Sequence, residues 1–191
     1  MNKKLLGADY LLLLLYLNDK EPIKGAVRLT KMMFLFNEQI AQVLKSKGLD
    51  SEKLPDFIAY NYGPFSKDVY EQIELFTGIG FVQTTDLYSQ EEMSDLDDVV
   101  ETEFIDECYK DGNELKNDNN YWEYSIADRG VGFVENELLP GLTGEQLEVL
   151  QAFKRRITTM PIKQLLYYVY TKYPDYTDKS LIKDEVLHSG E

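Results

Sequence analysis

The feature that most constrains the fold is an apolar run at residues 10–17, which is 8 residues long. A helix that is apolar on nearly all faces belongs in the centre of a protein core. A membrane-spanning helix needs about 20 apolar residues, and no small-residue cleavage site for a secretory signal follows the run. We therefore expect a buried first helix over residues 7–17 and no membrane partner.

The cysteine content is consistent with a protein that needs no covalent cross-link. Cys108 is the only cysteine among 191 residues, so no internal disulfide can form. A chain of this length buries about 70 % of its unfolded surface, which is enough for a stable core. We therefore expect a reducing, cytoplasmic location.

The order of predicted elements indicates a mostly helical α+β fold. A second helix is expected at 27–47, where apolar residues recur every three or four positions and Gly48 is a natural stop. Residues 56–63 predict a short strand or extended link, and Gly63 with Pro64 predicts a turn into a third helix at 66–76, capped by Ser66. Strands are expected at 80–89 and 121–128. Three helices followed by two strands are typical of a winged helix-turn-helix.

Charge is segregated into the connection between these two strands. The chain has a net charge of -14, and residues 86–120 hold 13 acids and two bases, a net of -11. The rest of the chain is therefore nearly neutral, and the sequence predicts an acidic insertion at the tip of the wing. A field of this sign opposes the approach of DNA.

The remaining third of the chain predicts a helical extension. Thr143 and Gln146 have the spacing of a capping box, and Pro161 is expected in the first turn of the next helix. A last short helix is expected at 180–187. We therefore divide the chain into a winged-helix domain at 1–128, with the acidic insertion at 86–120, and a helical C-terminal extension at 129–191 packed on it.

Two stretches resemble a known family, the SocA-like or Panacea-type antitoxins and related bacterial and archaeal winged-helix proteins. The similarity covers residues 25–82, and residues 165–180 show a weaker one. It rests on an approximate match to a Leu-x-Lys-Leu-aromatic helix, on a Tyr/His-Gly-Pro turn followed by a helix with tyrosine, and on a Gly-Leu-Ile or Gly-Phe-Ile start of the wing. The matching residues are Leu29, Lys31, Met32 and Phe34, then Tyr62, Gly63, Pro64 and Tyr70, then Gly80, Phe81 and Val82.

The resemblance implies a non-enzymatic regulatory protein. Members of this family are expected to be antitoxins that bind and neutralise toxins, or regulators encoded near mobile elements. The long acidic insertion departs from the family pattern. The leading hypothesis is therefore a protein-binding regulator, antitoxin-like or defence-associated, without a named partner.

Residues for catalysis, metal binding or cofactor binding are scarce. His188 is the only histidine and lies four residues from the end, so Ser-His-Asp and Cys-His chemistry would depend on a terminal residue. One cysteine and one histidine cannot build a tetrahedral zinc site. No glycine-rich phosphate loop follows a predicted strand. We expect no catalytic residues, no metal and no cofactor, and an enzyme of unrecognised type is the remote alternative.

The candidate partner-binding residues are aromatic and acidic. Tyrosine combines an apolar body with a polar tip and is enriched at interfaces. The alternative for the aromatic residues is that they only pack a strand against a helix. The alternative for the acidic insertion is that it is only a disordered, solvated loop without a partner. The candidates are Tyr60, Tyr62, Phe65, Tyr70, Asp95, Asp97 and Asp98.

A DNA-binding transcriptional regulator acting as a dimer is the second hypothesis. Winged helices often place their third helix in the major groove, but here that helix would present three acids and a single base. Basic residues occur around the second helix, and a homodimer through the tyrosine-rich tail stays open as well. The candidate nucleic-acid-binding residues are Lys24, Arg28, Lys31 and Lys67.

Overall fold

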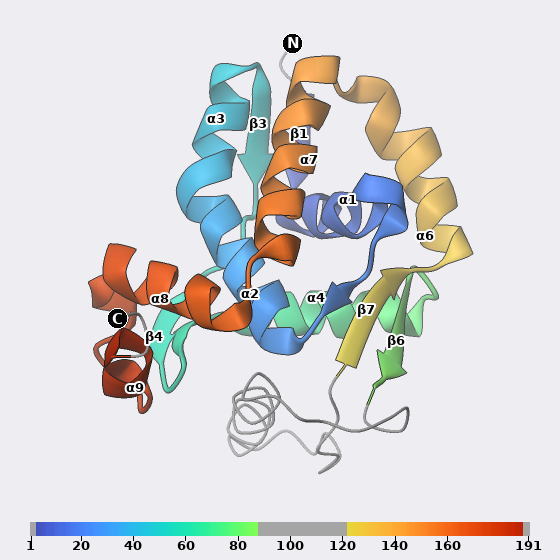
Figure 1. Cartoon of the computed structure of the whole chain (residues 1–191). Helices are drawn as coiled ribbons and strands as arrows, with labels where there is room; N and C mark the ends of the chain where they lie inside the picture. Colours follow the sequence, from blue (N-terminus) through green and yellow to red (C-terminus); the bar gives the residue numbers. More distant parts are fainter. Residues whose placement is uncertain (1–2, 88–121, 189–191) are drawn as a thin grey trace.

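The computed structural model describes residues 3–87 and 122–188, and it has a mostly helical α+β fold with three small sheets in this part of the chain (Figure 1). The α-helices are α1 (Gly7–Lys20), α2 (Ala26–Leu35), α3 (Ala41–Ser46), α4 (Lys67–Gly78), α6 (Asp128–Phe133), α7 (Gly144–Thr159), α8 (Ile162–Lys172) and α9 (Lys183–His188). The strands are β1 (Lys3–Leu6), β2 (Ile23–Lys24), β3 (Leu49–Glu52), β4 (Ile58–Tyr60), β5 (Gly63–Phe65), β6 (Val82–Asp86) and β7 (Trp122–Ile126).

Helix α1 lies in the centre of the core, as its apolar run predicts. Every side chain from Tyr10 to Leu15 is at most 1 % exposed. The helix packs against α7, β7 and the π-helical turn Val134–Leu138. Its regular part ends before Leu17, where the backbone leaves the helical conformation, so the predicted end is confirmed.

The predicted second helix is confirmed to within one residue at each end. Helix α2, a π-helical turn at Phe36–Ile40 and α3 form one continuous helix from Ala26 to Ser46. Gly48 follows with φ +81°, a conformation that glycine adopts without strain. Val43 is one of the apolar residues of the three-and-four pattern, but it is 41 % exposed, so the pattern does not predict burial at this position.

The central sheet is antiparallel with the strand order β2-β7-β6. Val82 pairs with Ile126 and Asp86 with Trp122, so the predicted strands on either side of the acidic segment are confirmed. Strand β2 pairs with β7 through Ile23 and Tyr124. It was not predicted because two residues carry no detectable alternation.

A second, parallel pair joins β1 to β3, with Lys3 opposite Leu49 and Leu6 opposite Glu52. Leu5 and Leu49 are buried on this pair. Neither strand was predicted. Strand β1 directly precedes the apolar run, and β3 is a polar segment with one leucine, so local pattern gave no signal for their pairing.

The third sheet is the β4–β5 hairpin, which leads directly into α4. Gly63 and Pro64 were expected to form a turn, but they belong to β5, and the turn lies at residues 61–62. Helix α4 starts after Ser66 as predicted, but the Ser66 hydroxyl makes no capping hydrogen bond in the described part of the chain, which corrects the expected cap. Val69, Ile73 and Phe76 are buried on the inner side of the helix.

The C-terminal helices pack on the same apolar cluster as the N-terminal ones. The capping box of α7 is confirmed, since the amide of Gln146 donates to Thr143 Oγ1 at 3.3 Å and the amide of Thr143 donates to Gln146 Oε1 at 3.0 Å. Pro161 lies just before α8 rather than in its first turn. Helices α8 and α9 lie beside the β4–β5 hairpin at one side of the molecule, and α6, β6 and β7 lie at the other (Figure 1). The division at residue 128 stays a prediction.

Candidate functional site

The β4–β5 hairpin is fixed on α2 by a buried lysine. Lys31 is fully buried, and its ammonium donates hydrogen bonds to the carbonyl oxygens of Tyr62 at 2.7 Å and Pro64 at 2.9 Å. Gly63 lies between them with φ +83°, and a Cβ atom there would be 3.0 Å from the ring of Tyr170. The hairpin backbone is therefore held tightly against the helices behind it.

Three of the four predicted aromatic side chains form one cluster, with Tyr60 and Phe65 on the hairpin and Tyr70 on α4. Ile58 is opposite Phe65, and side chains two apart on a strand share a face, which places Tyr60 beside them. The ring centroid of Phe65 is 5.1 Å from that of Tyr60 and 5.5 Å from that of Tyr70. These side chains are only partly buried, and Ile58 is 57 % exposed.

Tyr62 does not belong to this face, so its place among the surface candidates was wrong. It is 5 % exposed, because the turn points its side chain into the core. Its neighbour there is Tyr170, whose pKa is raised to about 12 by burial, against the effect of a hydrogen bond with Ser180. Tyr62 contributes to the core behind the surface.

Helix α4 continues the surface with a groove of about 480 Å³. Leu75 is 59 % exposed on its rim, and Asp68 accepts a hydrogen bond from the amide of Asp56 at 2.9 Å. The buried Oε1 atom of Gln72 has no hydrogen-bond partner in the described part of the chain. The groove is lined by Lys53, Leu54, Asp56, Asp68, Glu71, Gln72 and Leu75.

Two contacts join the hairpin segment to α4, the hydrogen bond from the amide of Asp56 to Asp68 and the stacked rings of Phe65 and Tyr70, although Asp68 and Tyr70 lie on different sides of the helix. We group the two features as one candidate binding site that combines apolar side chains with carboxylates. We call it the hairpin–α4 surface, defined by Ile58, Tyr60, Phe65, Asp68, Tyr70, Glu71 and Leu75. Ile58 and Leu75 were missed by sequence reasoning. The sequence could have predicted the exposure of Leu75, because this residue lies off the buried stripe of α4. It shares a side with Ile79, which is 38 % exposed.

The four basic residues predicted to contact nucleic acid do not all lie together: Lys24 and Arg28 line one pocket that also contains Glu21 and Glu123, whereas the burial of Lys31 corrects the prediction for that residue. Lys31 is buried, as described above. Arg28 donates to the carbonyl oxygens of Ile157 and Met160, both at 2.6 Å, and so caps the end of α7. The other two are exposed but face carboxylates. Lys24 lies 3.9 Å from Glu123, and Lys67 lies 3.1 Å from Glu71.

The three acidic candidates, Asp95, Asp97 and Asp98, lie outside the described residues. Within residues 3–87 and 122–188, no group of three or more His, Cys, Asp or Glu side chains could hold a metal ion. In the same ranges, none of the helices combines the length and the apolar character needed to cross a membrane.

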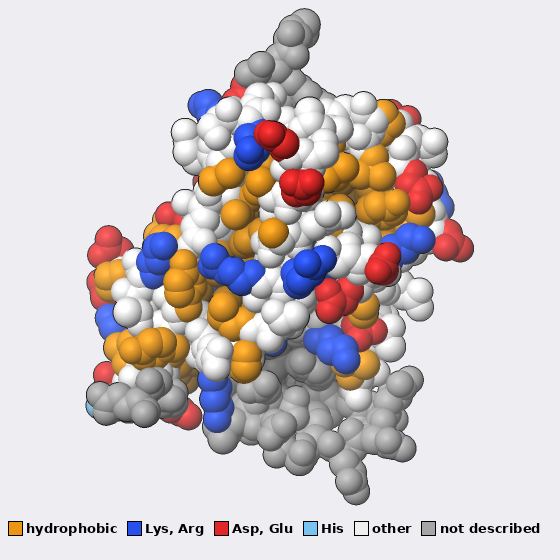
Figure 2. Space-filling model, turned by 45° about the horizontal axis from the view of Figure 1, so that its top comes forward, with side chains coloured by type: hydrophobic (Ala, Val, Ile, Leu, Met, Phe, Trp, Pro, Cys, Tyr) orange, Lys and Arg blue, Asp and Glu red, His pale blue; other side chains and the backbone are white. Residues whose placement is uncertain are grey.

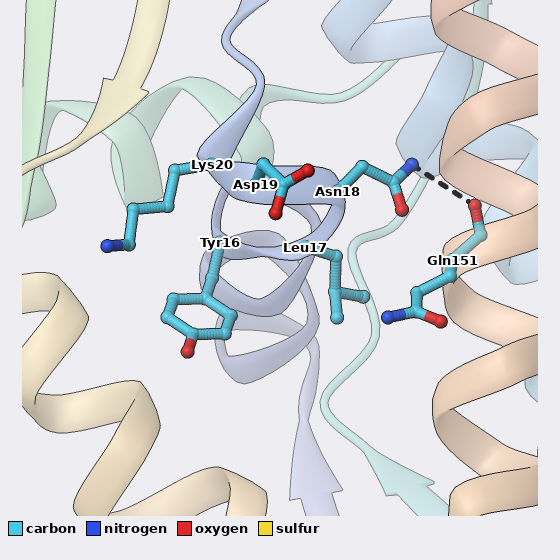
Figure 3. Close-up of a pocket in the computed structure, with 6 residues that line it drawn as sticks. All are labelled: Tyr16, Leu17, Asn18, Asp19, Lys20 and Gln151. Atoms are coloured by element: carbon cyan, nitrogen blue, oxygen red, sulfur yellow. Dashed lines mark hydrogen bonds between the residues drawn. The ribbon is translucent and has the colours of Figure 1, made fainter.

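A second cavity, of about 400 Å³, lies where α1 ends (Figure 3). Asn18, Asp19 and Lys20 all have positive φ, a conformation unfavourable for residues with a side chain. Asn18 Nδ2 donates to the carbonyl oxygen of Gln151 at 3.2 Å (Figure 3). From below the turn, the buried ammonium of Lys154 donates to the carbonyl oxygens of residues 17 and 21 at 2.7 and 2.5 Å. These bonds hold the turn on α7, so its unusual backbone conformation is explained by the packing of the fold.

No known protein-family profile, curated protein sequence or solved structure matches this chain.

Proposed function

We propose that the chain is a winged-helix regulatory protein that binds a partner protein through the hairpin–α4 surface. It would block a surface of the partner by binding to it, without catalysing a reaction, as an antitoxin-like or defence-associated regulator does. The resemblance to the SocA-like and Panacea-type antitoxins supports this proposal. So does the composition of the surface itself.

The order of elements supports the winged-helix part of the proposal. Strand β2 lies between α1 and α2 in the chain and pairs with β7, while β6 and β7 enclose the acidic segment. A winged helix has this arrangement of helices, a small three-stranded sheet and a wing. In that framework α4 takes the position of the helix that often enters the major groove of DNA.

The observation that carries the proposal is the character of α4 at this position. Its outer side presents Asp68, Glu71 and the exposed Leu75, and its one basic residue, Lys67, is paired with Glu71. Carboxylates repel phosphates, whereas a DNA-binding helix gains affinity from unpaired cations. Exposed apolar side chains with a polar rim are instead typical of protein interaction sites.

The experiment is capture of the partner with matched surface variants. Ile58, Leu75 and Val43 are all exposed, so Ile58→Asp, Leu75→Asp and Val43→Asp make the same chemical change without entering the core. Tagged full-length chain would be purified from host cells after nuclease treatment. We expect a stoichiometric protein partner with the wild type and Val43→Asp, and at least about a 10-fold loss with the other two, since an apolar anchor contributes about 1–2 kcal/mol or more.

Thermal unfolding of all four proteins is the control for folding. The proposal would be contradicted if no protein partner remained after nuclease treatment. It would also be contradicted if the three variants, all folded, retained the partner equally.

A further inference from the structure

The helices α7 and α8 carry a basic surface in an otherwise acidic chain. Residues 149–174 include five basic side chains and no acidic one, although the chain has 34 acids and only 20 Lys and Arg residues. One of the five, Lys154, points inward and is buried. The other four, Arg155, Arg156, Lys163 and Lys172, are exposed, and we call them the α7–α8 face.

These four cations have no carboxylate partner among the described residues. Ion pairs in that part of the chain involve Lys4, Lys24, Lys47, Lys67 and Lys183 instead. Figure 2 views the side of the molecule that carries α7 and α8, and Lys and Arg side chains lie in a row across its middle. Cations that lack a carboxylate partner attract a ligand that carries several negative charges.

Two of the cations are positioned around an aromatic ring. The guanidinium carbon of Arg156 lies 5.3 Å from the ring centroid of Tyr168, and the ammonium of Lys172 lies 5.5 Å from it. The hydroxyl of Tyr168 accepts hydrogen bonds from Lys172 at 3.2 Å and Gln39 at 2.8 Å. Burial would raise the pKa of Tyr168, but these donors outweigh it and lower the pKa, which agrees with a positive potential on this face.

A second tyrosine on this face is available for contact. Tyr167 is 37 % exposed, and its side chain has no hydrogen bond or ring contact with the described residues, since the bond from Thr171 goes to its backbone carbonyl. It lies four residues after Lys163 on α8, so the two side chains share one side of the helix. A free aromatic ring next to a cation without a carboxylate partner is a combination with which proteins bind single-stranded nucleic acid, because bases stack on aromatic rings and phosphates pair with cations.

We propose that the α7–α8 face binds single-stranded nucleic acid, with the four cations on phosphates and Tyr167 stacked on a base. This surface shares no residue with the hairpin–α4 surface and does not depend on the function proposed for it. Charges farther away than about 8 Å are largely screened at physiological ionic strength. Local unpaired cations therefore attract phosphates although the net charge of the chain is -14.

The test is fluorescence anisotropy of a labelled oligothymidine of about 20 nucleotides, titrated with the full chain at several salt concentrations. Four phosphate contacts predict that the logarithm of the association constant falls with the logarithm of salt with a slope of about -3. Arg155→Glu with Lys163→Glu should weaken binding at least about 10-fold, since this variant removes half of the phosphate contacts. The side chains of Arg155 and Lys163 make no hydrogen bond or ion pair with the described residues, so this double substitution breaks no such bond there.

The matched control is Lys45→Glu with Lys179→Glu, the same charge change at two exposed lysines outside this face. It should leave the affinity within about 2-fold of the wild type, because screening limits the effect of distant charges. Tyr167→Ala should weaken binding about 5-fold or more, since stacking contributes about 1–3 kcal/mol per base.

Three results would overturn the proposal. The first is no binding at low salt, and the second is an equal loss in both double variants. The third is binding of polyglutamate as tight as that of the oligonucleotide together with no effect of Tyr167→Ala, which would identify an acidic protein as the ligand of this face.

Discussion

The hairpin–α4 surface and the α7–α8 face both contain lysines, but they use them in opposite ways. Behind the hairpin, the ammonium of Lys31 is buried and bonded to two backbone carbonyls, and the surface in front of it is apolar and acidic. On α7, Lys154 is buried in the same manner, whereas the adjacent Arg155 and Arg156 point outward without a carboxylate partner among the described residues. The bonds of a cation, rather than its position in a basic stretch of sequence, therefore decide whether it can contact a ligand.

The largest effect is expected from removing the buried ammonium behind the hairpin. Lys31→Met keeps the length of the side chain but leaves the carbonyls of Tyr62 and Pro64 without their donor. We expect a loss of about 3 kcal/mol in the free energy of unfolding, because a buried bond to a charged group contributes about 1.5–3 kcal/mol. Urea unfolding followed by circular dichroism measures it.

The matched control for this prediction is Lys67→Met, which removes an exposed ion pair within α4. It should leave the unfolding midpoint close to that of the wild type. Equal effects of the two substitutions would show that the hairpin does not depend on Lys31.

The second prediction concerns the pH dependence caused by Lys154. Burial lowers the pKa of Lys154 from 10.5 to about 8, against an opposing attraction from Glu21. Between these two values the unfolded chain binds more protons than the folded one, so the free energy of unfolding rises with pH. Between about pH 7.5 and 9.5 this contribution amounts to about 2 kcal/mol.

Comparison with Lys154→Met isolates this contribution, because the tyrosines and other groups titrate in both proteins. The difference in unfolding free energy between wild type and variant should shift in favour of the wild type as pH rises over this range. A difference that stays constant with pH would contradict the assignment of a lowered pKa to Lys154.

The third and smallest effect is expected at Gly63. Gly63→Ala places a methyl group 3.0 Å from the ring of Tyr170 at a residue with φ +83°. We expect a loss of about 1–2 kcal/mol, since left-handed backbone is unfavourable for residues with a Cβ atom. Gly132→Ala is the control, because nothing lies within 4 Å of its Cβ position in α6, and alanine should raise stability by about 0.5–1 kcal/mol there. Thermal unfolding separates the two, and a stabilised Gly63→Ala would contradict the packing described for the hairpin.

Much of the fold could be predicted because its signals are local. The apolar run fixed α1 in the core, the three-and-four periodicity found the long second helix, and the Thr143–Gln146 spacing found the start of α7. Alternation identified β6 and β7. Strands β1, β2 and β3 were missed because their pairing partners are distant in the sequence or because they are too short to show a pattern.

The candidate site was predictable only in part, since burial depends on tertiary packing. Tyr60, Phe65 and Tyr70 do form one surface, but Tyr62, two residues from Tyr60, turns into the core. Lys31 could not be separated from exposed lysines by its position, because only the fold brings two backbone carbonyls to its ammonium. Leu75 is a different case, since its position off the buried stripe of α4 could have been read from the sequence.

The most direct test of the protein-binding claim is site-specific photo-crosslinking in host cells. A photoreactive residue would replace Leu75 on the hairpin–α4 surface or, in a separate protein, Val43, which is also exposed but lies on α3. We predict a discrete protein adduct from position 75 that resists nuclease and is absent from position 43. No adduct at position 75, or the same adducts from both positions, would contradict the claim that the hairpin–α4 surface binds a partner protein.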